Sequence, residues 1–467
     1  MKRGCGHLTI DSLLFAPHSR EKRIGTRMAH IIPFHGTLYN PATVGDVSQV
    51  VAPPYDIIDN VLQKTLHDRH PNNVIRLELG YEQTGDTATD NKYTRAAGAL
   101  KEWLKTGVLR KDSRPAVYYH TIEYRPPYSA PGTPTKVFKG FLSTVELEEF
   151  GSGKIYPHEN TRAAAKTDRL NLLEACRANF SAIISLYSDP QNEVLTLLEQ
   201  SIAADTPRID FQDDEGFRQR LWSVTDPKVL AKVVEIMHTK QLFIADGHHR
   251  YETALNYRRA RRQQAGAPTS PQPYDNVLML FASLEDKGLT VLPTHRVLTT
   301  PMPAPAELLR ALDPVFEVTA LPFQAGTEAQ VRAQFIERLR SQGQSVPMFG
   351  LALKNDPQYY LLTLRAAHRP TASTSPRDRL DVSLLQQHVV STLCPTQQAQ
   401  EAMLYSKDDH EALNWVRQGT GTAALLLNPT KVAEVKAVAS AGERMPHKST
   451  YFFPKPLTGL VMNAMEG

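Results

Sequence analysis

The sequence predicts an α+β fold in two domains, a larger N-terminal domain built on a mixed sheet and a smaller α/β C-terminal domain. Three observations favour this architecture. The 467 residues are enough for two or three domains. Strand-like and helix-like hydrophobic patterns follow one another without strict alternation. Loops rich in proline, serine and glycine separate these patterns.

The hydrophobic patterns predict the following elements. In the N-terminal domain we expect a β-hairpin at 116–124 and 136–146, helices at 161–178 and 228–237, a buried strand at 242–245, and a strand pair at 277–284 and 289–298. In the C-terminal domain we expect helices near 304–312, 327–341, 380–392 and 408–418, and strands near 347–353, 357–364 and 421–427.

The proline-rich segment at 300–305 is the most natural domain boundary. It divides the chain into a motif-bearing catalytic domain at 28–300 and a C-terminal domain at 301–467. Residues 1–27 are polar and basic and show no clear period. We therefore expect a disordered extension there that carries no chemistry.

The composition is that of an ordinary globular protein, with 41% hydrophobic and 22% charged residues. A net charge of +4 neither demands nor excludes a polyanionic partner. The three cysteines lie far apart, so neither a zinc site nor a disulfide framework is indicated, and a reducing cytoplasm fits best. No apolar run approaches the ~20 residues of a membrane span.

The most informative stretch is a turn between a short apolar strand and a helix, which holds Asp246, Gly247, His248, His249 and Arg250. Gly247 permits a close backbone approach or a φ that other residues resist. The helix N-terminus favours an anion, and Arg250 offers a guanidinium fork suited to phosphate. The two histidines can donate, accept or shuttle a proton. Together these residues predict an anion site, phosphate above all, whereas in a plain structural turn Asp246 would only cap the helix.

A second cluster lies upstream of this turn. His158 and Glu159 directly precede a predicted helix, on which Arg162, Lys166 and Arg169 follow at spacings of four and three. Residues at these spacings share a helix face, so we expect a cationic stripe. Such a stripe beside a His–Glu pair suits a substrate that carries phosphate and carboxylate groups. The alternative is a solvated helix face, with Glu159 acting on the helix dipole.

Three further segments are weaker candidates. A Pro–Pro pair imposes a stiff, extended turn that would project Tyr55 and Asp56 into a site. On a later strand, alternation lets only one of two neighbouring polar side chains point inward, and we expect it to be Arg296. Near the end of the chain, Lys448 or Lys455 could reach a phosphate, but the aromatic residues between them favour a docked core strand.

Several dispersed motifs together resemble a known family. The chain is similar to the large prokaryotic family named domain of unknown function 1015, and the resemblance spans about residues 28–467. The motifs lie at 33–41, 51–58, 72–80, 157–170, 245–255, 292–298 and 445–461. The family name implies no function. Because the last motif again carries the family pattern, we expect the C-terminal tail to fold back near the turn.

Locally, the turn resembles the phosphate turn shared by ParB-like proteins, sulfiredoxins and ADP-dependent free serine kinases, and the serine kinases are most similar. Sulfiredoxins carry a reactive cysteine where this chain has His248, so their chemistry is absent here. ParB-like proteins have an arginine-rich turn and a downstream Glu–Asn motif, whereas Glu159 and Asn160 lie upstream. The resemblance implies a phosphotransferase that acts on serine or phosphoserine with a nucleotide, ADP or ATP, and Mg²⁺.

Phosphoryl transfer needs positioned phosphates, neutralised charge and often a base on the attacking hydroxyl. We expect His249 and Arg250, with the helix N-terminus, to hold the phosphates. Asp246 would bind Mg²⁺ or orient a histidine. Glu159 or His158 would act as the base toward a small hydroxyl substrate. Kinase and phosphate-removing activities would use the same groups, so the direction stays open.

Two other functions stay open. One is a ParB-like, nucleotide-dependent DNA-binding or regulatory protein, for which the arginines at 258–262 are a candidate surface. A basic helix C-terminus explains these arginines more simply. The other is a metal-dependent hydrolase with an ion held by His158, Asp246 and either His248 or His249. We expect a small-molecule substrate and neither nucleic acid nor a membrane as partner, and the sequence leaves a homo-oligomer open.

Overall fold

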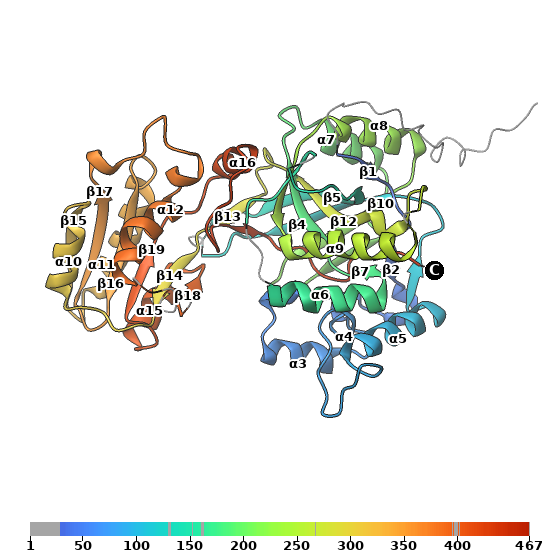
Figure 1. The fold of residues 1–467 in the computed structure, drawn as a ribbon, viewed down its shortest axis with the longest axis horizontal. Helices are drawn as coiled ribbons and strands as arrows, with labels where there is room; N and C mark the ends of the chain where they lie inside the picture. The colour runs from blue at the N-terminus through green and yellow to red at the C-terminus, as the bar shows by residue number, and fades with distance from the viewer. Residues whose placement is uncertain are drawn as a thin grey trace, which may run out of the picture.

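A computed structural model describes residues 29–128, 132–151, 153–159, 163–266, 268–394, 396, 400 and 402–466. Two predictions therefore lie outside the described residues: the disordered extension at 1–27 and the placement of Arg162. The described chain forms two lobes, each around its own sheet (Figure 1). The predicted α+β fold class with a mixed sheet is confirmed.

The first lobe is built on a nine-stranded mixed sheet. Its strands are β1 (Ile31–Ile32), β4 (Val117–Tyr124), β5 (Lys136–Glu146), β6 (Ile155–Tyr156), β8 (Ile183–Tyr187), β9 (Ile209–Gln212), β10 (Arg218–Val224), β11 (Leu242–Asp246) and β12 (Asn276–Ser283). The order is β6-β11-β8-β12-β5-β4-β10-β9, with β1 beside β5. Only the β6–β11 and β8–β12 pairs are parallel. The central strands are buried on both faces, which explains their continuous apolar sequences.

Helices cover both faces of this sheet (Figure 1). One side carries α7 (Glu193–Ser201) and α8 (Pro227–His238). The other side carries α3 (Asn60–Arg69), α4 (Ile75–Glu78), α5 (Lys92–Lys105) and α6 (Ala163–Cys176). Helix α9 (His248–Gln264) follows β11 directly and packs along α6. Shorter elements are α2 (Pro41–Val44), η1 (Val47–Gln49), η2 (Tyr55–Ile57), η3 (Pro273–Asp275), and the paired strands β2 (Thr37–Tyr39) and β3 (Leu109–Lys111).

The second lobe is built on a six-stranded antiparallel sheet. Its strands are β14 (His295–Leu298), β15 (Phe316–Pro322), β16 (Met348–Leu353), β17 (Gln358–Leu364), β18 (Leu404–Ser406) and β19 (Ala423–Leu426), in the order β15-β17-β16-β19-β14-β18. Its helical elements are α10 (Pro305–Leu312), α11 (Glu328–Gln342), η4 (Ala366–His368), η5 (Arg377–Arg379), α12 (Asp381–Leu385), η6 (Gln386–Val390), α13 (Ser391–Leu393), α15 (Asp409–Arg417) and α16 (Val432–Ser440). Phe335 and Leu339 of α11 and Leu413 of α15 join the buried core beside the sheet.

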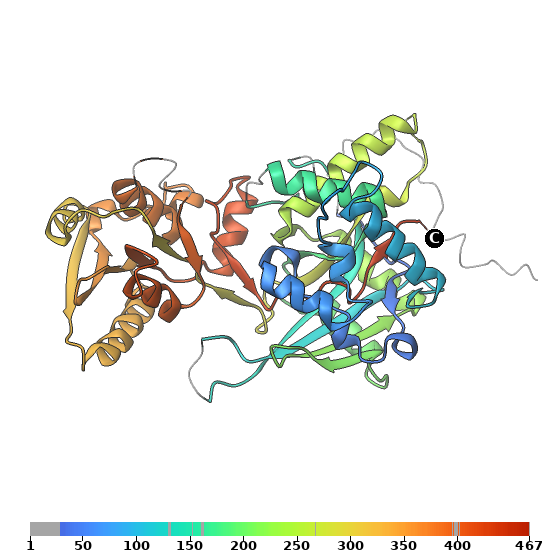
Figure 2. The same ribbon diagram turned by 90° about the horizontal axis from the view of Figure 1, so that it is seen from below.

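The chain leaves the second lobe and returns to the first, as both views show (Figures 1 and 2). Strand β20 (Tyr451–Phe453) pairs with β13 (Thr290–Leu292), and β21 (Asn463–Ala464) pairs with β7 (Ala178–Asn179). Strand β14 lies before the boundary expected at 300, yet it pairs within the second sheet. The division of the chain into domains stays a prediction.

Most predicted elements are found, and one pairing is wrong. The hairpin of β4 and β5 is confirmed, and the helix expected at 161–178 is found as α6. The strands expected at 277–284 and 289–298 do not pair with each other, because β12 lies between β5 and β8. The second of these segments splits at Pro293 into β13 and β14, since proline offers no N–H to a ladder.

Candidate functional site

The predicted turn joins β11 to α9, with Asp246 ending the strand and His248 beginning the helix. Gly247 between them has a φ of 93°, in the left-handed region that favours glycine. A Cβ added at Gly247 would lie 2.9 Å from the Nε and Nη2 atoms of Arg250. Glycine therefore serves here both for its conformation and for the space that the Arg250 side chain occupies.

Asp246 is held by two cations. Its Oδ1 accepts a hydrogen bond from Lys455 Nζ at 2.5 Å, and its Oδ2 accepts one from Arg250 Nη2 at 2.8 Å. Burial alone would raise the pKa of this carboxyl, but Lys455 and Arg250 outweigh burial and hold the pKa well below its ordinary value. Asp246 is therefore an anion that fixes two cations beside the N-terminus of α9.

Arg250 retains donor capacity after these contacts. Its Nη1 donates to the carbonyl of Ala182 at 2.7 Å, and its Nη2 binds Asp246. Its Nε is buried and has no hydrogen-bond partner among the described residues. A buried donor without a partner costs free energy that a ligand acceptor would recover. Arg250 also lines a small hollow together with Arg169, Ser181 and Asn179.

His158 and His248 pack against each other in the interior. Their rings meet edge to face with centroids 4.6 Å apart, and the backbone N–H of His158 donates to His248 Nε2 at 3.2 Å. Burial lowers the pKa of His158 to about 4 and lowers the pKa of His248 well below its ordinary value. Both rings are therefore neutral at pH 7. Both histidines are therefore interior residues. Their lowered pKa values make both rings weak bases.

Glu159 differs from these histidines because its surroundings raise its pKa and make it a stronger base than an ordinary carboxylate. Its Oε1 accepts a hydrogen bond from the backbone N–H of Lys448 at 3.1 Å, and its carbonyl accepts one from Arg444 at 2.9 Å. Burial raises the pKa of Glu159, the Asp246 charge raises it further, and the Lys448 charge opposes both. Among the two predicted bases, Glu159 is thus the stronger proton acceptor at neutral pH.

The segment 444–455, here called the C-terminal segment, completes the site. The N–H of Met445 donates to the carbonyl of His158 at 2.7 Å, and Thr450 Oγ1 lies 3.2 Å from His158 Nε2. Lys448 adopts a φ of 56°, a left-handed conformation that is unfavourable for its residue type. Three segments distant in sequence therefore meet here: 157–159, 246–250 and 444–455.

The interpretation of the C-terminal segment as core needs a correction. Phe452 and Phe453 are indeed buried, and they belong to the core cluster of the first lobe. Lys455, however, has a side chain only 8% exposed and binds Asp246, so it is part of the site. A lysine between two prolines beside buried aromatic residues was the available signal, because a buried lysine needs an anionic partner.

The predicted cationic stripe on α6 is engaged in ion pairs with neighbouring helices. Lys166 Nζ lies 2.9 Å from Glu252 of α9. Arg169 is buried, and its Nη1 lies 3.0 Å from Glu78 of α4 while its Nε and Nη2 bind Asp168. The structure thus gives both cations a role in joining helices, and Arg162 lies outside the described residues.

Of the remaining predicted residues, His249 belongs to the turn, and the others lie on other elements. Tyr55 lies under Arg169, whose Cζ is 4.3 Å from the ring centroid. Asp56 is exposed on η2, and its charge contributes to raising the pKa of Tyr451. Arg296 is buried in β14 and donates to the carbonyl of Lys448 at 3.1 Å, so it positions the C-terminal segment. His249 lies half-buried in the first turn of α9.

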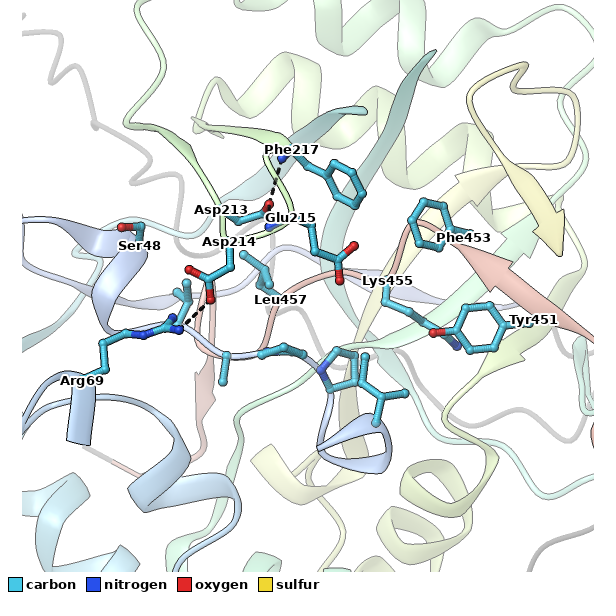
Figure 3. Close-up of a pocket in the computed structure, with 15 residues that line it drawn as sticks. Ser48, Arg69, Asp213, Asp214, Glu215, Phe217, Tyr451, Phe453, Lys455 and Leu457 are labelled. Atoms are coloured by element: carbon cyan, nitrogen blue, oxygen red, sulfur yellow. Dashed lines mark hydrogen bonds and ion pairs between the residues drawn. The ribbon is translucent and has the colours of Figure 1, made fainter. Parts of the chain in front are cut away.

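A small hollow of about 60 Å³ adjoins the site (Figure 3). Lys455 and Tyr451 lie on one side of it, and acidic residues of the β9–β10 turn lie on another (Figure 3); Pro53 and Pro54 also line the hollow. Asp214 is paired with Arg69 at 2.7 Å, whereas Glu215 extends toward the Lys455 side (Figure 3). The hollow is therefore connected to Asp246 through Lys455, which lines the hollow and binds that carboxylate.

The residues do not fit a metal ion held by the protein alone. Within the described ranges, no three His, Cys, Asp or Glu side chains converge as metal ligands do. Both oxygens of Asp246 are engaged with cations, which opposes the metal role that the sequence suggested. The buried Nε of Arg250 and the cations around Asp246 fit phosphate oxygens instead.

The arginine run after the turn is largely neutralised. Arg258 and Arg259 bind Glu149, and Arg262 binds Asp275 at 2.7 Å. Paired arginines present less free charge to a polyanion. In the part of the chain that the structure covers, no helix is both long and apolar enough to cross a bilayer.

The chain belongs to the family described as "Protein of unknown function (DUF1015)", which it matches over residues 31–383. This confirms the predicted family. The match ends before Lys407 and the C-terminal segment. A search of curated proteins gives no match.

Similar solved structures include a free serine kinase in complex with ADP, at 12% identity and a TM-score of 0.32, covering 70% of this chain and 91% of that chain. They also include SbnI with a C-terminal truncation from Staphylococcus aureus, at 12% identity and a TM-score of 0.33, with coverage of 68% and 85%. A conserved hypothetical protein from Pyrococcus furiosus matches at 13% identity and a TM-score of 0.31, with coverage of 66% and 91%. Likeness of this degree does not bear on substrate or activity.

Proposed function

We propose that this protein is a phosphotransferase that moves a phosphoryl group between a nucleotide and a small hydroxy amino acid, serine or phosphoserine first. The observation that carries the proposal is the arrangement around Asp246. The half-buried carboxylate of Asp246 holds Lys455 and Arg250 against the N-terminus of α9. Fixed cations at a helix N-terminus are the groups that neutralise phosphate charge in phosphoryl transfer.

The nucleotide phosphates would bind the first N–H groups of α9, with Arg250 Nε as a further donor. These groups are already fixed in place, so they need no reorganisation when charge develops on the transferring phosphoryl group. The phosphates of either ADP or ATP could accept hydrogen bonds from these donors. Mg²⁺ would arrive on the nucleotide phosphates, since the described side chains do not form a metal site of their own.

Glu159 is the proposed base. In the kinase direction it takes the proton of the substrate hydroxyl as the hydroxyl oxygen bonds to phosphorus and the bond to the donor oxygen breaks. Burial raises its pKa, which makes it a better proton acceptor than an ordinary carboxylate. Arg444 and Lys448 hold Glu159 in place through the contacts described above.

The experiment is a binding and turnover assay of the purified protein. We expect ADP, ATP or phosphoserine to raise the melting temperature, and the Arg250→Ala variant to lose that shift. Glu159→Gln should keep the shift but lower kcat by about 10² or more, the usual contribution of a general base. Lys354→Met, at an exposed turn of the second lobe, is the control.

Failure of ADP, ATP and phosphoserine alike to shift the wild-type melting temperature would remove the phosphotransferase proposal. Unchanged turnover of Glu159→Gln would remove Glu159 from the base role while leaving the phosphate site in place. Incubating serine with each nucleotide, and phosphoserine with ADP, then shows by phosphorus NMR which direction the protein catalyses.

A further inference from the structure

Two ammonium groups from different lobes share one aromatic ring. Lys455 Nζ lies 4.7 Å from the centroid of the Tyr451 ring, and Lys407 Nζ lies 4.2 Å from the same centroid. Lys455 belongs to the C-terminal segment in the first lobe. Lys407 directly follows β18 at the edge of the second sheet. The ring of Tyr451 attracts both cations but carries no net charge. Asp246 balances the charge of Lys455, and the ring leaves the charge of Lys407 unbalanced.

The charge of Lys407 lacks a nearby counter-ion. No carboxylate lies within ion-pair distance of its Nζ in the ranges that the structure describes, although it is half-buried. Burial lowers the pKa of Lys407 and the charge of Lys455 lowers it further, while the charges of Glu215 and Glu411 raise it. A partly desolvated cation beside like charges costs free energy unless an anion binds there.

We propose that Lys407 and Lys455 together bind a phosphoryl dianion beside the Tyr451 ring, so that the second lobe supplies one of the phosphate ligands; Lys455 and Tyr451 also line the hollow of Figure 3. The inference rests on the proposed function, because it assigns a second set of ligands to the same transferred group. A dianion carries enough charge to balance two ammonium groups, whereas a single carboxylate balances one. The phosphoryl group comes either from the nucleotide or from phosphoserine, and the two sources are separated below.

The test compares dissociation constants by titration calorimetry for ADP, phosphoserine and serine. We expect Lys407→Met to weaken at least one phosphorylated ligand by about tenfold or more, the loss expected for a charge-assisted contact. Lys407→Arg should restore binding to within about threefold, because the charge remains. The phosphorylated ligand that weakens identifies the source of the phosphoryl group. Lys354→Met should bind all three ligands as the wild type does.

A second readout separates binding from a structural role. Because Lys407 lies among like charges, Lys407→Met should leave the ligand-free melting temperature unchanged or raise it. A fall in the ligand-free melting temperature together with unchanged binding would overturn the inference. The inference would also be overturned if Lys407→Met weakened the binding of serine and of phosphoserine equally, since Lys407 would then contact the carboxylate of the amino acid. If Arg250→Ala loses binding while Lys407→Met keeps it, the inference fails and the proposed function stands. If the wild type binds neither ADP nor phosphoserine, both fail.

Discussion

At the scale of single residues, the turn depends on how closely the Arg250 guanidinium lies to the backbone of Gly247. The guanidinium folds back over the glycine to reach Asp246, so the space beside the Gly247 Cα is filled by a cation. Because Gly247 has no side chain, the Arg250 guanidinium can lie next to the N-terminus of α9. Gly247 therefore permits both the backbone conformation of the turn and the position of the Arg250 charge beside it.

Gly247→Ala should lower the free energy of unfolding and weaken ADP or phosphoserine binding. The φ of 93° costs about 1–2 kcal/mol for alanine, and the added Cβ must displace Arg250. Gly85→Ala is the matched control, because Gly85 has a φ of 98° with nothing within 4 Å of an added Cβ. Urea unfolding and calorimetry measure the two effects. Wild-type ligand affinity in Gly247→Ala would contradict the role given to the Arg250 position.

At the scale of elements, α6 shows how much a helix pattern alone predicts about its cations. The spacing placed Lys166 and Arg169 on one face, and that geometry is a local property of any helix. What covers this face is not local, since Glu78 comes from α4 and Glu252 from α9. The sequence therefore predicted the helix and the alignment of its cations. It could not show that acidic residues of other helices form ion pairs with these cations.

Arg169→Met should lower the free energy of unfolding by about 3–5 kcal/mol, because it leaves the buried carboxylate of Glu78 without its partner. The Arg169 and Glu78 side chains are 6% and 4% exposed. Lys166→Met is the comparison, and its more exposed pair with Glu252 should cost less than about 1 kcal/mol. Chemical denaturation of both variants is the measurement. Equal, small losses would show that the buried pair contributes no more than the exposed one.

At the scale of the whole molecule, the site is a meeting of three segments, and the sequence predicted all three but not the partner of Lys455 in the third. The turn at 246–250 and the segment at 157–159 each place unusual residues side by side, so they are visible as motifs. The C-terminal segment was expected to return, but its lysines are interleaved with core aromatic residues and carry no local sign of their partner. Lys407 comes from the other lobe, and no pattern in the sequence links it to Tyr451.

Stability should fall as the pH drops from about 6.5 toward 4. Burial lowers the pKa of both His120 and His158 to about 4 from an ordinary 6.5. Between pH 6.5 and 4 the unfolded chain therefore binds more protons than the folded chain does. The stabilisation is complete above pH 6.5 and is lost as the pH falls, by roughly 3 kcal/mol for each histidine. His120→Gln, remote from the turn, should flatten the melting temperature between pH 7 and 5, and an unchanged slope would contradict neutral burial of His120.

The return of the C-terminal segment to the first lobe also sets the order in which the site is completed during synthesis. Residues 246–250 leave the ribosome about two hundred residues before Lys455. At 5–20 residues per second this interval lasts roughly 10 to 40 seconds. Throughout it Asp246 has Arg250 as a cationic partner but lacks Lys455, and Glu159 lacks the backbone N–H of Lys448. The nascent chain thus carries the turn long before it carries the full set of charges around it.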